Sequence, residues 1–253
     1  MNFFFGINSE FFKSEIQIPL FKNREIKPLN LKLFKCFPKN QKWVIEQMKH
    51  NKNNECFFLL KKNEILNNEV YFLANEDDLA NYDNSKLQNF NSYTDTMPDY
   101  RANLKIFLEK GGFSSYQSEY PYSMITRKGS ILSSVSSVTN TNAEKNYILL
   151  KNIFEEPVHE KSSAYLVNIK LRKIEVEYQI QSNFTNCLEI NNKLIKPEVF
   201  LITKSFLGVP AYISIKNKHI SFEHTHPPHT YIQSNDKFKR VKDLKEEINE
   251  IIN

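Results

Sequence analysis

Short β-prone runs separated by turn-forming residues fill residues 146–226, and they constrain the fold more than any other feature of the sequence. Pro157, Asn183 and Asn217 are among the intervening turn formers, so the runs recur about every 8 to 12 residues. This spacing predicts an antiparallel β-sandwich or barrel. The runs are Tyr147 to Phe154, Ala164 to Ile169, Ile174 to Ile180, Phe184 to Ile190, Val199 to Thr203, Ala211 to Ile215 and His219 to His226.

The remainder of the chain predicts additional strands and two helices. Apolar runs at 56–60 and 70–73 indicate interior strands, and 103–108 indicates another strand. Between Pro38 and His50 the apolar residues follow a helical period, with Asn40 as an N-cap. A second helix, from Asp236 to Ile251, carries an apolar stripe at intervals of three or four residues.

These elements predict an α+β protein that is mostly antiparallel β, with a C-terminal β-sandwich or barrel and a terminal helix. An Asn-, Asp- and Ser-rich stretch before Pro98 marks the expected boundary between regions. The expected regions are a mixed α/β region at 1–98, an antiparallel β-sandwich domain at 99–234 and an amphipathic helix at 235–253. No internal repeat is visible in the sequence.

Composition limits the partners and the compartment. The 253 residues carry a formal net charge of +5, but the 34 basic and 29 acidic residues are interspersed, so a nucleic-acid partner is not expected. No apolar run approaches the roughly 20 residues of a membrane helix, so a membrane partner is not expected. Cys36, Cys56 and Cys187 are widely separated and predict reduced thiols in a cytoplasmic protein.

The stretch from Phe222 to His229 holds three of the six histidines. His224 and His226 fall on one face of an extended strand, and two prolines hold His229 close to them. Neutral imidazoles at this spacing bind a divalent transition metal such as zinc, which gives a metal-dependent enzyme as the alternative function. No cofactor is assured, because the same histidines also suit ligand binding, a subunit contact or closure of a sheet end.

A second unusual stretch runs from Gly111 to Tyr122. Two adjacent glycines in a chain with five predict a backbone conformation that other residues avoid. Aromatic, hydroxyl, amide and carboxylate side chains follow, and together they suit a small polar or carbohydrate-like ligand. A loop packed over a sheet edge is the other interpretation.

We therefore expect a protein that binds a small polar or carbohydrate-like ligand, or a protein partner, where these two stretches meet. Whether it is an enzyme, and whether it forms a homo-oligomer, stays open. The expected roles are ring stacking, hydrogen bonding and neutralisation of an acidic group, from Tyr116, Gln117, Glu119, Tyr122, Arg127, His224 and His226.

Overall fold

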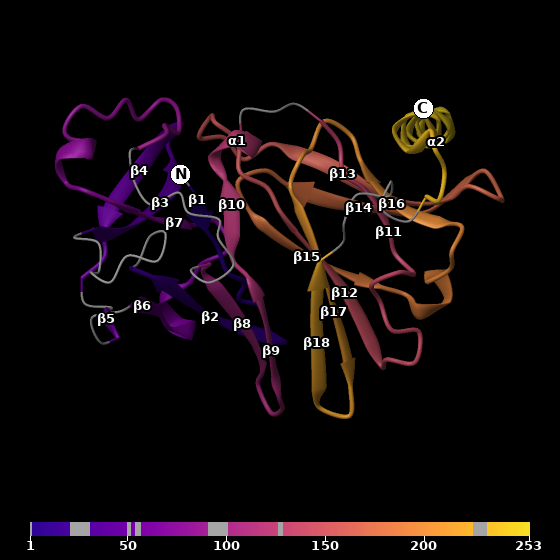
Figure 1. Ribbon diagram of the computed structural model, residues 1–253, viewed down its shortest axis with the longest axis horizontal. Helices are drawn as coiled ribbons and strands as arrows, with labels where there is room; N and C mark the ends of the chain where they lie inside the picture. The colour runs from indigo at the N-terminus through magenta and orange to yellow at the C-terminus, as the bar shows by residue number, and fades with distance from the viewer. Residues whose placement is uncertain are drawn as a thin grey trace. The chain divides into compact units, whose positions relative to one another are not determined.

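The computed structural model describes residues 2–20, 31–49, 52–53, 57–90, 101–125, 129–224 and 232–253, and most of its regular secondary structure is β-strand (Figure 1). The chain forms two compact units. Unit 1 contains Met1–Arg127, Lys151–His159 and Ser182–Thr185, and unit 2 contains Lys128–Leu150, Glu160–Gln181 and Asn186–Asn253.

Unit 1 contains two five-stranded sheets. Sheet A has the order β10-β1-β7-β3-β4, with β1 (Asn2–Phe4), β3 (Lys32–Lys39), β4 (Lys42–Gln47), β7 (Val70–Ala74) and β10 (Glu119–Pro121). Sheet B has the order β5-β6-β2-β8-β9, with β2 (Phe12–Pro19), β5 (Lys52–Asn53), β6 (Phe57–Leu60), β8 (Asn103–Leu108) and β9 (Phe113–Gln117). The short helices are η1 (Lys62–Glu64), η2 (Asp77–Leu79) and α1 (Tyr122–Ile125).

Unit 2 is built on two four-stranded sheets. Sheet C has the order β11-β16-β13-β14, with β11 (Leu132–Ser134), β13 (Lys161–Asn168), β14 (Lys173–Gln181) and β16 (Val199–Thr203). Sheet D has the order β15-β12-β17-β18, with β12 (Lys145–Lys151), β15 (Thr185–Ile190), β17 (Val209–Lys216) and β18 (His219–His224). η4 (Asn192–Leu194) and α2 (Lys237–Ile252) complete the unit.

The two units share one strand order. Strands β1, β7, β3 and β4 of sheet A correspond in chain order and position to β11, β16, β13 and β14 of sheet C. Strands β6, β2, β8 and β9 of sheet B correspond in the same way to β15, β12, β17 and β18 of sheet D. The chain therefore repeats one eight-stranded topology, although no internal repeat is visible in its sequence. Among the described strands, β5 and β10 of unit 1 are additions to it.

Burial explains how two different sequences form the same crossover between sheets. In each unit a strand is followed by a 3-10 helix and a turn, which lead into the next sheet at β7 or β16. In both units, apolar residues are buried at the end of the first strand, after the 3-10 helix and at the start of the next strand, and their burial holds the connection in place. They are Leu60, Ile65 and Val70 in unit 1, and Ile190, Ile195 and Val199 in unit 2.

Both sheets of unit 2 contribute to its main core, which includes Ile148, Leu166, Leu201 and Tyr212. Helix α2 lies beside sheet C (Figure 1), and the fully buried Ile248 joins a second apolar cluster with side chains of that sheet. The expected terminal helix is confirmed, and it docks on its own unit.

The predicted fold is confirmed in its coarse form, as mostly antiparallel β with a C-terminal helix. The sandwich or barrel expected over 99–234 is corrected, because strands of that range are distributed over four separate sheets. For example, β8 pairs antiparallel with β2, which joins residues from both sides of the expected boundary at residue 98. The division into regions 1–98, 99–234 and 235–253 stays a prediction about folding units. Sheets A and B do not follow the boundary at residue 98, because each contains strands from both sides of it.

The helix expected between residues 38 and 50 is wrong, because β4 forms a hairpin with β3 there. Asn40 and Gln41 have φ of 52° and 57°, so Asn40 makes a tight hairpin turn instead of capping a helix. Asn217 and Lys218 make the expected β17–β18 turn in the same way. No described glycine has a positive φ, so the special backbone expected at 111–112 is also wrong.

Candidate functional site

Tyr116 and Gln117 lie on β9, the edge strand of sheet B, with their side chains on opposite faces. Tyr116 is opposite Leu104, which is fully buried, so the tyrosine is on the core side. Gln117 is opposite Asn103 on the other side, and it accepts a 2.6 Å hydrogen bond from the Arg101 guanidinium. A ligand lying on one face of the sheet therefore contacts one of the two predicted residues.

Glu119 and Tyr122 follow β9 and bond to the main chain of unit 1. The Glu119 carboxylate accepts a hydrogen bond from the Ala102 amide at 3.1 Å. The Tyr122 hydroxyl donates to the Leu87 carbonyl at 3.4 Å. Burial, and next the charge of Glu155, raise the pKa of Tyr122, so its hydroxyl stays protonated at neutral pH. Both side chains stabilise the unit, and their ligand roles stay predictions.

His224 ends β18, where it is half-buried and opposite Ala211. Arg127, His226 and His229 lie outside the described residues. Across the ranges that the structure describes, no group of three His, Cys, Asp or Glu side chains is placed to hold a metal ion. The zinc-type alternative needs His226 and His229, so it stays a prediction.

The expected meeting of the two sequence stretches also stays a prediction, because Gln117 belongs to unit 1 and His224 to unit 2. The shared topology nevertheless relates them. Gln117 ends β9 and His224 ends β18, and these are corresponding strands of the two units. The two stretches singled out in the sequence therefore each contain the end of a corresponding strand.

Gln117 is part of a partly exposed surface that we call the polar face of sheet B. Cross-strand pairing places alternate residues of β2, β8 and β9 on this face, whereas intervening residues such as Ile16 and Ile106 are fully buried. Three rows cross the face: Gln17, Asn103 and Gln117; Glu15, Lys105 and Ser115; Lys13, Phe107 and Phe113.

Two lysines and two phenylalanines on this face form what we call the Lys–Phe cluster. The ring centroids of Phe107 and Phe113 are 5.5 Å apart, with 36° between the ring planes. Lys62 Nζ, from η1, lies over the Phe107 ring, 4.1 Å from its centroid, and Lys105 Nζ lies over the Phe113 ring at 5.7 Å. Such contacts contribute about 0.5–1 kcal/mol each at exposed sites. Because Phe113 is 58% exposed, the cluster presents aromatic and cationic groups to solvent.

Amide groups form the row at the other end of the polar face. Asn103 lies between Gln17 and Gln117. Its Oδ1 atom is buried and has no hydrogen-bond partner among the groups described. A buried acceptor without a donor costs about 1–3 kcal/mol. Because this atom is buried, a ligand on this face reaches the amide groups of the partly exposed Gln17 and Gln117 instead.

The corresponding face of unit 2 has a different composition. In the β17–β18 hairpin, Ala211 is opposite His224, Ile213 is opposite Phe222, and Ile215 is opposite Ile220. Ala211, Ile213 and Phe222 are buried, with exposures of 5%, 0% and 4%. The repeated topology therefore does not require lysine, amide and exposed phenylalanine side chains at these positions.

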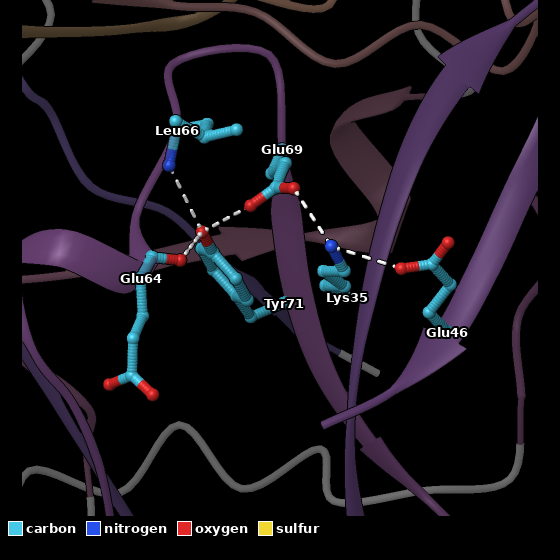
Figure 2. Close-up of polar contacts among 6 residues, drawn as sticks. All are labelled: Lys35, Glu46, Glu64, Leu66, Glu69 and Tyr71. Carbon is cyan, nitrogen blue, oxygen red and sulfur yellow. Dashed lines mark hydrogen bonds and ion pairs between the residues drawn. The ribbon is translucent and has the colours of Figure 1, made fainter. Parts of the chain in front are cut away.

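A second polar cluster in unit 1 was not expected from the sequence (Figure 2). The Tyr71 hydroxyl lies 2.8 Å from the Glu69 carboxylate and 3.0 Å from the Glu64 carbonyl, and it accepts a 3.2 Å bond from the Leu66 amide. Lys35 Nζ is 3.4 Å from the Glu69 carboxylate. Burial, and next Glu69, raise the pKa of Tyr71. The groups are partnered and the carboxylate is 4% exposed, so the cluster braces the turn before β7.

Lys151, at the end of β12, supports the same turn. Its Nζ donates to the carbonyls of Asn67 and Glu69, both at 3.3 Å, and the residue is 1% exposed. Burial lowers its pKa from 10.5 to about 7, although Glu69 opposes the shift. A titrating amine is a functional candidate in principle. Its inaccessibility and two carbonyl partners indicate a structural role, which was not expected from the sequence.

None of the described helices is long and apolar enough to cross a membrane. The cytoplasmic location and the homo-oligomer stay predictions. Comparison of the chain with protein-family models, with curated proteins and with solved structures gives no match.

Proposed function

We propose that this protein binds a polar, carbohydrate-like ligand on the polar face of sheet B. The observation that carries the proposal is the Lys–Phe cluster beside the amide row, on a face that is aliphatic and buried in the corresponding hairpin of unit 2. The exposed Phe113 ring contributes little to folding, and the amide side chains of Gln17 and Gln117 are partly exposed. They are the side chains that a carbohydrate site uses.

The chemistry of the face fits a sugar ring. Phe113, which is 58% exposed, supplies apolar area for a C–H face of the sugar, and the partly exposed Gln17 and Gln117 supply amide groups for its hydroxyl groups. Because these residues lie on strands of one hydrogen-bonded sheet, they are held in place before the ligand binds. This preorganisation lowers the entropic cost of binding.

Gln117 keeps the role expected from the sequence, and Arg101 orients its amide through the 2.6 Å hydrogen bond. Tyr116 is on the core side of β9, so in this proposal it supports the strand from below. A protein partner on the same face is the competing ligand class, and it would use the same exposed Phe113.

A glycan array followed by calorimetry on the bound sugars tests the proposal. We expect Phe113→Ala to weaken binding about tenfold, because truncation removes an exposed stacking surface without opening a core cavity. The matched control is Phe238→Ala on α2, where the ring is 77% exposed but lies in unit 2. Binding by Phe113→Ala that equals the wild type, or the absence of any glycan ligand, contradicts the proposal.

A further inference from the structure

We propose that the ligand is an acidic polysaccharide of the uronic-acid type, whose carboxylates lie against the lysines of the Lys–Phe cluster. This inference rests on the proposed function and names its substrate class. Charge on the polar face motivates it: Lys13 and Lys105 belong to the face and Lys62 Nζ lies over one of its rings, against the single carboxylate of Glu15. Beside the face, Arg101 is offset by Glu119, whose carboxylate accepts a hydrogen bond from the Ala102 amide. The surplus of cations is complementary to a polymer with one negative charge per sugar.

The geometry of the lysines favours carboxylate recognition. Lys62 and Lys105 come from different elements, η1 and β8, and each ammonium lies over a phenylalanine ring. The two rings are in contact, with centroids 5.5 Å apart, so both ammonium groups lie close to one aromatic pair. A sugar stacked on that pair brings a ring carboxylate within reach of an ammonium, and charge-assisted hydrogen bonds are about twice as strong as neutral ones.

An extended chain fits the surface better than a single sugar. Lys13 lies on β2 and Lys105 on β8, which are neighbouring strands about 4.8 Å apart. Lys62 lies on η1, and Arg101 precedes β8. A polymer contacts several of these cations together, and each contact adds to the affinity. Single-stranded nucleic acid is the weaker fit, because successive bases stack on several exposed aromatic rings, and of the two rings in the Lys–Phe cluster Phe113 alone is mostly exposed.

The test compares polygalacturonate with its fully methyl-esterified form, which keeps the sugar backbone and removes the charge. Affinity electrophoresis of the full chain provides the measurement, with poly(U) as a third polymer. We expect polygalacturonate to bind about tenfold more tightly than the ester and the affinity to fall as salt is raised. We expect the double variant Lys62→Gln/Lys105→Gln to lose that advantage.

The matched control is Lys39→Gln/Lys42→Gln, which removes the same charge from exposed residues at the β3–β4 turn of sheet A. It should bind polygalacturonate as the wild type does, and an equal loss in both double variants overturns the inference. Equal binding of acid and ester that is lost in Phe113→Ala overturns the acidic assignment and leaves the proposed function standing. Tighter binding of poly(U) overturns the acidic assignment, and binding of none of the three overturns both proposals.

Discussion

Lys151 illustrates at the residue scale how the fold can bury a charge that the sequence presents as ordinary. Its amine donates to the Asn67 and Glu69 carbonyls, and these contacts span more than 80 residues of chain. The donors satisfy carbonyls that are otherwise left in a dry interior. The cost appears in the pKa, which burial lowers to about 7.

We predict that the free energy of unfolding rises with pH because of this residue. The unfolded chain binds a proton at Lys151 up to its ordinary pKa of 10.5, whereas the folded chain releases it near pH 7. Stability should therefore increase by about 2 kcal/mol between about pH 7 and pH 9. Urea denaturation across this range measures it, and Lys151→Met should remove the increase.

Lys245→Met provides the comparison for this measurement. Lys245 Nζ donates to the Ser130 carbonyl, and burial lowers its pKa, but the residue is only partly buried. Its replacement should remove a smaller part of the pH dependence. Parallel stability curves for the wild type and Lys151→Met would show that the amine is not buried as described.

The bounds predicted for helix α2 from the sequence agree closely with the structure, but the prediction of which residues it buries does not. Its apolar stripe predicted one buried face, but Phe238 in that stripe is 77% exposed while Ile248 is fully buried. The helix therefore docks on sheet C from Val241 onward, and its first turn is in solvent. Arg172 adds surface ion pairs to Glu247 and Glu250 at 3.3 and 3.4 Å, which contribute about 0–1 kcal/mol each.

We predict that Ile248→Ala lowers the free energy of unfolding by about 2–4 kcal/mol, because it leaves a cavity against Leu132, Val167 and Ile202. Phe238→Ala on the same helix should change it by less than about 0.5 kcal/mol, since its ring is mostly in solvent. Chemical denaturation compares the two variants. Similar effects would mean that α2 does not dock through Ile248.

At the scale of the whole molecule, the two units are not continuous in sequence, because segments of unit 1 occur between segments of unit 2. Lys151–His159 and Ser182–Thr185 belong to unit 1 although they interrupt unit 2. The Glu155 carbonyl accepts hydrogen bonds from Trp43 Nε1 at 2.7 Å and from the Leu87 amide at 2.8 Å. Thr185 Oγ1 donates to the Gly6 carbonyl at 3.1 Å. Unit 1 is therefore complete only after most of the chain is present.

We predict that a fragment of residues 1–127 does not fold stably by itself, because it lacks the acceptor for Trp43 and the donor from Lys151. Amide dispersion in a two-dimensional NMR spectrum measures this against the full chain. A longer fragment, 1–159, restores both groups and should melt at a higher temperature than 1–127. A well-dispersed spectrum for 1–127 would show that unit 1 does not depend on the later segments.

The sequence by itself predicted the strands of residues 146–224, the antiparallel character and the terminal helix, because alternation of apolar and polar residues and helical periodicity are local properties. It predicted a helix where β4 lies. It also indicated Gln117 and His224 as residues of interest. Only the tertiary structure decided which strands pair, that one topology occurs twice, and that Lys62, Lys105, Phe107 and Phe113 lie together. Those outcomes depend on contacts between distant segments, and a local pattern of side chains does not encode which distant strand completes a sheet.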